Sequence, residues 1–305
     1  MSKFDYVIVG AGSSGSALAG RLATNKHTKI LLLEAGPEDL NPYIKIPIGY
    51  GKLFYDQSVN WKFYTEPEEN LHGKKMYWPR GKVLGGSSSI NAMVFARGSR
   101  NDFDEWGANA SGWSWDDIEP FFRKMETWKG KSDQSRGQSG PVRVTDVSTQ
   151  AHPLTNCYLE ATEQIGISKN PDYNTGNIEG SFVYQTNTHK GLRSSASNAY
   201  LSPIKKQKNL VVITRALVKK IIFEGARAVG VEYSHKGSPK VVHATKEIII
   251  SAGALGSPQL LQISGIGPAE KLKNLNIKVL SDLPDVGLHL KDHIGLDHTL
   301  LTNQP

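Results

Sequence analysis

The stretch Phe4-Asp5-Tyr6-Val7-Ile8-Val9-Gly10-Ala11-Gly12-Ser13-Ser14-Gly15 decides the fold of this chain. The residues before Gly10 are rich in β-formers and predict a buried strand. Residues 14–24 predict a helix with an apolar stripe, interrupted once, at Ala17, Leu18, Arg21 and Leu22. Residues 29–33 predict a second strand. Strand, helix and strand in this order form a βαβ unit, which opens a parallel sheet.

Each part of the glycine motif has a physical role in holding a dinucleotide. Gly10 permits the tight turn, Gly12 lets the backbone approach a pyrophosphate, and Gly15 lets the helix pack on the strand. Ser13 and Ser14 open the helix, where unpaired N–H groups and the positive end of the dipole favour phosphate. Glu34 and Ala35 end the second strand, and the Glu34 carboxylate suits the ribose and disfavours the 2′-phosphate of NADP. The motif leaves NAD and FAD open.

A second glycine-rich segment, Gly81-Lys82-Val83-Leu84-Gly85-Gly86-Ser87-Ser88-Ser89-Ile90-Asn91, chooses between them. Together with Phe95, Gly98 and Asp104 it resembles the first signature of the glucose–methanol–choline (GMC) oxidoreductases. Residues 253–267 (GALGSPQLLQISGIG) resemble the second signature, and residues 284–293 are similar to a third element. The resemblance covers the whole chain and is strongest to the bacterial alcohol and choline dehydrogenase branch. It implies FAD as the cofactor.

The resemblance also implies the architecture. We expect an α/β chain with a Rossmann-like FAD-binding domain, whose parallel sheet carries an antiparallel β addition, and an incomplete α+β cap or substrate domain. The FAD-binding domain is expected to be discontinuous, with its C-terminal part missing. It would comprise residues 1–40, 80–105 and 205–293, and the cap residues 41–79, 106–204 and 294–305.

The same match implies further cofactor contacts. The residues expected beside the flavin ring are Val83, Gly86, Ser87, Asn91, Ala92, Met93 and Val94. Val218 is expected at the adenine, and Ala252 and Gly253 at the cofactor after an Ile-rich strand. Some family members attach FAD covalently through a histidine just before the asparagine. Ile90 stands at that position and has no nucleophilic atom, so we predict noncovalent FAD.

The family reaction is oxidation of a primary alcohol to an aldehyde, with hydride transfer to flavin N5 and a histidine as base. The resemblance therefore implies an alcohol substrate and an electron acceptor such as oxygen or a quinone. The base is expected beyond Pro305, so no catalytic residue is assigned, and no metal site is expected. The nine histidines are interpreted as surface or structural residues. A complementary C-terminal chain is a further possible partner.

Three other functions stay open at this point. A hydroxynitrile-lyase-like enzyme could use the same scaffold without redox chemistry. A flavin-binding module could lack catalysis of its own. An NAD-binding Rossmann protein is the weakest alternative.

The remaining segments give coarser predictions. Residues 37–79, rich in Pro, Gly, Tyr and Trp, are interpreted as an excursion over the nucleotide site. Helices are predicted for residues 115–125, capped by Ser114, and for residues 151–165. Three segments alternate like antiparallel strands: residues 210–214, 218–223 and 228–233. Residues 247–251 predict a central strand buried on both faces, and residues 294–301 a strand that enters the substrate sheet.

Composition limits the class of protein. The 305 residues have 38% hydrophobic and 21% charged side chains, typical of a soluble globular protein. The net charge of +7 includes a lysine cluster at Lys205, Lys206, Lys208, Lys219 and Lys220. No aromatic interleaving accompanies this cluster, so we interpret it as a solvated face rather than a nucleic-acid site. The single cysteine, Cys157, is expected to be buried and indicates a reducing compartment. With no apolar run long enough to span a membrane, we expect a cytoplasmic protein, and leave peripheral attraction to anionic membranes open.

Overall fold

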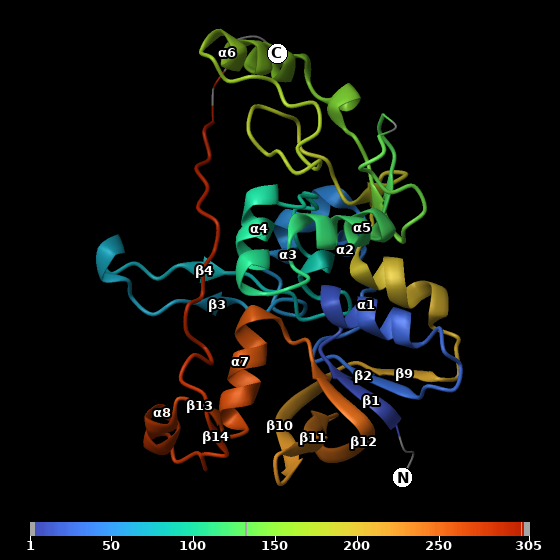
Figure 1. The fold of residues 1–305 in the computed structure, drawn as a ribbon, viewed down its shortest axis with the longest axis vertical. Helices are drawn as coiled ribbons and strands as arrows, with labels where there is room; N and C mark the ends of the chain where they lie inside the picture. The colour runs from blue at the N-terminus through green and yellow to red at the C-terminus, as the bar shows by residue number, and fades with distance from the viewer. Residues whose placement is uncertain (1–3, 132, 300, 302–305) are drawn as a thin grey trace.

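The computed structural model describes residues 4–131, 133–299 and 301 (Figure 1). The strands are β1 Phe4–Val9, β2 Ile30–Leu33, β3 Phe63–Tyr64, β4 Tyr77–Trp78, β5 Glu126–Trp128, β6 Val142–Val144, β7 Thr188–His189, β8 Leu192–Arg193, β9 Leu210–Ile213, β10 Ala216–Glu224, β11 Arg227–His235, β12 Ser238–Ile250, β13 Ile266–Gly267 and β14 Ser281–Asp282. The α-helices are α1 Ser13–Leu22, α2 Pro42–Lys45, α3 Tyr50–Leu53, α4 Arg100–Asn109, α5 Trp115–Met125, α6 Pro153–Gln164, α7 Gly253–Ile263 and α8 Ala269–Asn274. Short 3₁₀ turns span Pro47–Gly49, Glu69–Leu71, Gly86–Ser89, Ser148–Gln150 and Ser202–Ile204, and a π-helix spans Ser197–Leu201.

The main sheet has six strands in the order β10-β11-β12-β1-β2-β9. β1 pairs in parallel with β2 and with the second half of β12, and β2 pairs in parallel with β9. β10, β11 and the first half of β12 pair antiparallel. This sheet confirms the predicted βαβ unit and the predicted parallel sheet with an antiparallel addition.

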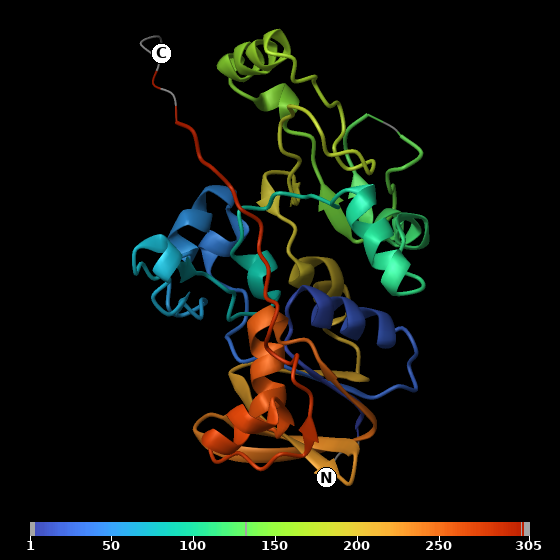
Figure 2. The same ribbon diagram turned by 60° about the vertical axis from the view of Figure 1, so that its left-hand side comes forward.

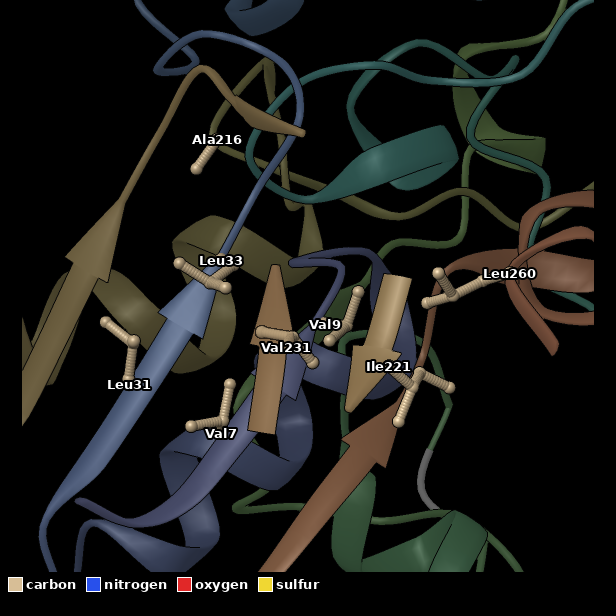
Figure 3. Packing of buried hydrophobic residues seen from close by; sticks show 8 residues of the cluster. All are labelled: Val7, Val9, Leu31, Leu33, Ala216, Ile221, Val231 and Leu260. Carbon is tan, nitrogen blue, oxygen red and sulfur yellow. The ribbon is translucent and has the colours of Figure 1, made fainter. Parts of the chain in front are cut away.

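The two faces of β1 and β2 pack into two different cores, because successive strand residues point to opposite faces. Val7, Val9, Leu31 and Leu33 pack with residues of β10, β11 and α7 in one core (Figure 3). On the other face, Ile8, Ile30 and Leu32 pack against Ala19 of α1 and against Ala23, which follows this helix. The all-apolar sequence of these strands therefore reflects burial on both sides.

Helix α1 turns mainly small residues toward the sheet; of the predicted stripe, Leu22 packs partly buried against the core. Its buried residues are Gly15, Ser16 and Ala19, whereas Leu18 is exposed. A Cβ atom placed on Gly15 would lie 1.9 Å from the carbonyl oxygen of Gly10, so only glycine permits this close packing. The prediction was wrong for Leu18 because the helix lies so close to the strand that only small side chains fit between them. Hydrophobicity alone does not report this limit on side-chain size.

Two strand predictions need correction. Residues 210–213 form a strand, but β9 runs parallel to β2, with Ile30 opposite Leu210 and Leu33 opposite Ile213. The long connection between these strands allows the parallel arrangement, which a short apolar pattern does not specify. The isoleucines at 248–250 lie centrally, as predicted, but they are only half-buried. β11 pairs only with residues 238–243 of β12, which leaves the outer edge of residues 247–250 without a strand neighbour among the described residues.

The predictions for residues 294–301 and for Cys157 were also wrong. Residues 288–299 form no strand, and Ile294 is 95% exposed. An alternating pattern does not make a strand without a neighbouring backbone to pair with; Leu300 lies outside the described residues. Cys157 is exposed on α6. Helix α6 buries only Thr162, so it provides no core in which the thiol could be enclosed.

The region that carries α4, α5 and α6 lies apart from the main sheet, with α1 between them (Figure 2). α5 begins and ends as predicted, and Ser114 caps it in a reciprocal bond pair with Asp117. α6 is slightly shorter than its predicted range. Within the described residues, no helix has the length and apolar character needed to cross a membrane. The boundary proposed between the FAD-binding and cap domains stays a prediction.

Candidate functional site: a dinucleotide cavity

A cavity of about 720 Å³ opens where β1, β2 and β12 end. It is bounded by the glycine turn after β1, by Glu34 after β2, and by Ser251 and Ala252 after β12. The carboxyl ends of parallel strands, beside the start of a helix, are where open α/β sheets bind ligands. A larger hollow of about 1110 Å³ is lined by residues of β1, β2, β9, β11 and β12, but it contains none of the predicted cofactor residues.

The two glycine segments predicted from the sequence meet in this cavity. The N–H of Gly85 donates to the carbonyl oxygen of Ala11 at 2.8 Å. A Cβ atom on Gly86 would lie 2.7 Å from Gly12 Cα, whereas a Cβ on Gly12 would have Gly86 Cα as its nearest neighbour at 3.9 Å. Gly86 therefore serves the contact between the two segments, and Gly12 leaves open space toward the cavity, as a bound pyrophosphate requires.

The start of α1 can hold an anion. Its N-cap residue, Gly12, makes no side-chain hydrogen bond to the helix, so the first N–H groups have no cap. Ser13 and Ser14 line the cavity at this point. Unpaired N–H groups and the positive end of the helix dipole together favour phosphate. The geometry fits the predicted pyrophosphate.

Glu34 is a buried carboxylate at the edge of the cavity. Its Oε2 accepts from the N–H of Ala11 at 2.9 Å, and its Oε1 accepts from the N–H of Gly36 at 2.8 Å. Burial raises the pKa of Glu34, and these backbone N–H groups offset part of that rise. Each oxygen keeps a further lone pair, so the carboxylate can still accept a ribose hydroxyl.

The predicted residues do not all line the cavity. Those that line it are Gly10, Gly12, Ser13, Ser14, Glu34, Ala35, Gly86, Ser87, Val218, Ala252 and Gly253. Gly15 instead packs against the strand, and Val83 lies in a separate apolar core with Ile90. Asn91, Ala92, Met93 and Val94 continue the same loop outside the cavity lining. Their predicted place beside the flavin ring stays a proposal.

Sequence reasoning missed an aromatic wall. Trp61 and Phe63 line the cavity with nearly parallel rings, 5.8 Å apart between centroids and inclined by 8°. The left-handed backbone of Lys62 (φ 54°) separates them, and the ammonium of Lys82 lies 4.7 Å from the Trp61 ring. The only feature of the sequence that could have indicated this wall was the high aromatic content of residues 37–79. Residues from this excursion do reach the cavity.

None of the nine histidines lines the cavity, and all nine lie in the described part of the chain. His189 and His235 are half-exposed and the other seven are exposed. The cavity therefore supplies binding groups and backbone dipoles, and no candidate for a proton-transferring imidazole.

The chain belongs to the GMC oxidoreductase family, whose model matches residues 4–295. Human mitochondrial choline dehydrogenase is 43% identical to it over 302 residues, which cover 96% of this chain and 51% of the relative. Pyridoxine 4-oxidase from Mesorbium loti has a TM-score of 0.89 at 33% identity, with 93% of this chain and 56% of that chain covered. Formate oxidase from Aspergillus oryzae, in a structure that concerns FAD modification, has a TM-score of 0.87 at 28% identity, with 94% and 52% covered.

These matches confirm the family, the Rossmann-like fold and FAD as the cofactor that the sequence predicted. The chain spans about half the length of the relatives it matches. Activity, substrate and partners are properties of the whole protein, and they are treated as proposals below.

Proposed function

We propose that this chain is the cofactor-binding half of an FAD-dependent oxidoreductase that oxidises a primary alcohol to an aldehyde. The observation that carries the proposal is the meeting of two glycine segments at one cavity, beside the uncapped start of α1. The kinship with choline dehydrogenase supports a small alcohol as substrate. Oxygen, a quinone or another acceptor would reoxidise the flavin.

The residues of this chain have separate roles in the proposal. When bound, FAD supplies the redox chemistry by accepting a hydride from the alcohol carbon at N5. The start of α1 would hold the pyrophosphate, Glu34 would accept a hydrogen bond from a ribose hydroxyl, and Val218 would contact the adenine. The loop from Gly86 to Val94 would border the ring. The groups that move the alcohol proton are proposed to belong to the remainder of the protein, because no histidine lies at this cavity.

Anaerobic reduction by an alcohol tests this proposal directly. The complete protein, in which this chain is joined by its complementary part, is mixed with choline, and separately with simple primary alcohols, under argon, and the visible absorption of the flavin is followed. We expect at least one alcohol to bleach the flavin and to form the corresponding aldehyde. Bleaching by none of them, with FAD still bound, would contradict alcohol oxidation. Product formed without any acceptor and without bleaching would instead indicate a lyase.

A flavin-binding module without catalysis is the second candidate. The lack of histidines at the cavity favours it for this chain alone. The two candidates differ in one result: a module binds FAD tightly and shows no turnover, whereas the proposed enzyme turns over when its complementary part, in the same or a second chain, is present.

The FAD is predicted to be held without a covalent bond. Ile90 is buried in an apolar core with Ile44 and Val83 and has no atom that could bond to the flavin. Acid precipitation of the yellow protein should therefore release all of the flavin into the supernatant. Flavin that stays with the precipitated protein, located by mass spectrometry of peptides, would contradict this prediction.

A further inference from the structure

Arg193 is a buried cation whose partners are all neutral. Its side chain is at the end of β8, and the residue is 5% exposed. Nε donates to the carbonyl oxygen of Ile44 at 2.8 Å, and Nη1 donates to the carbonyl oxygen of Ser88 at 3.1 Å and to Asn91 Oδ1 at 2.8 Å. Nη2 is buried and has no hydrogen-bond partner among the described residues. Burial lowers the pKa of Arg193 to about 10. Buried cations usually pair with carboxylates, so this arrangement calls for an explanation.

The contacts with Arg193 and with the N–H of Met93 together fix which way the Asn91 amide is turned. Asn91 Oδ1 accepts from Arg193 Nη1 and also from the N–H of Met93 at 3.1 Å. Both partners can only donate, so the atom between them must be the oxygen. The two N–H donors of Asn91 Nδ2 are therefore left for another partner, and no described residue accepts from them.

The loop that carries Asn91 is held in a strained shape from outside. Met93 is buried with φ at 64°, a left-handed conformation that is strained for a non-glycine residue. A second tie comes from the segment after Arg193, because the N–H of Ala196 donates to Ser88 Oγ at 2.9 Å. The segment from Arg193 to Ala196 thus fixes the loop at two points. Such strain persists where a site needs one geometry.

We propose that Arg193 is a positioning residue for the flavin: it turns Asn91 so that the side-chain N–H groups, and not the oxygen, face the ring. The inference rests on the proposed function, since it needs the ring beside Asn91. The ring carries acceptor oxygens and nitrogens and gains negative charge on reduction. N–H donors stabilise that charge, and a carboxylate or carbonyl oxygen at the same place would oppose it.

Two variants of the FAD-loaded protein test this. Asn91→Asp keeps an acceptor for Arg193 and Met93 and pairs the buried cation, but it replaces the N–H donors by oxygen. We expect thermal stability to be maintained, FAD to bind at least about tenfold more weakly, and the flavin midpoint potential to fall. Arg193→Lys keeps the charge but cannot form all three bonds, and it should also weaken FAD binding and lower the potential.

A double-mutant cycle separates positioning from a structural role. In an Asn91→Ala background, Arg193→Lys should change the FAD dissociation constant by less than about threefold, because its target is gone. Arg143→Lys, beside Ser194 in the same region, is the control and should change neither readout. Equal effects of Arg193→Lys in both backgrounds, or an Asn91→Asp protein with wild-type affinity and potential, would overturn the inference. A wild-type protein that binds no FAD would instead overturn the proposed function and the inference with it.

Discussion

Replacing Glu126 by glutamine is expected to lower the free energy of unfolding by about 3–5 kcal/mol, the cost of breaking a buried ion pair from one side. Glu126 is fully buried. It accepts from Arg97 Nη2 at 2.7 Å, from Arg136 Nε at 2.8 Å and from the N–H of Gly137 at 2.8 Å. The substitution would leave two buried guanidinium groups without this carboxylate. Urea unfolding of the wild type and the variant measures the loss.

The two arginines of this network differ in their partners. Burial lowers the pKa of Arg97, and the Glu126 carboxylate offsets only part of that effect. Burial acts on Arg136 in the same way, but its bonds to Glu126 and to Asp172 outweigh it and raise the pKa. Arg97 is thus the less compensated cation, and loss of Glu126 should affect it most. This network ties β5 to the loops around residues 97, 136 and 172.

Glu163→Gln is the matched control for this prediction. Glu163 pairs with Lys169, and the two side chains are 47% and 42% exposed. Solvent screens such a pair, so its loss should cost no more than about 0.5 kcal/mol. If Glu126→Gln were as mild as Glu163→Gln, the buried network would not be a major source of stability.

Substituting aspartate for Gly12 is expected to weaken FAD binding strongly without harming the fold. Gly12 has the extended backbone of an N-cap (φ −71°, ψ −161°), and a Cβ there meets no atom closer than 3.9 Å. Aspartate is a preferred N-cap, so apoprotein stability should stay the same or rise by about 0.3–1 kcal/mol. The new charge would face the pyrophosphate, and like charges about 4 Å apart repel by roughly 4 kcal/mol at an effective dielectric constant of about 20. FAD should therefore bind at least about 100-fold more weakly.

Titration of the apoprotein with FAD, together with its melting temperature, measures both effects. Gly51→Asp is the control, because a Cβ on Gly51 meets nothing within 4 Å and Gly51 lies outside the cavity lining. It adds the same charge and should leave FAD binding unchanged. Wild-type affinity in the Gly12→Asp protein would show that no pyrophosphate lies at the start of α1.

Prediction from the sequence succeeded where a residue's role depends on its near neighbours. The strand before Gly10, the helix after it and the Ser114 cap followed from local backbone preferences. Prediction failed where the arrangement of a segment depends on another segment that is distant in the sequence. β9 runs parallel to β2, and the sequence of the four residues of β9 does not indicate the direction of its neighbouring strand.

Functional contacts divide in the same way. The sequence alone predicted a dinucleotide site at the start of α1, because glycine is needed where backbones approach a ligand. The resemblance of two signatures to one family then indicated FAD as the cofactor. Only the tertiary structure decided that Trp61 and Phe63 reach this cavity, and that Arg193 holds Asn91 from 102 residues away. The physical reason is that a buried donor takes the acceptor that packing brings to it, and packing joins segments that no local pattern connects.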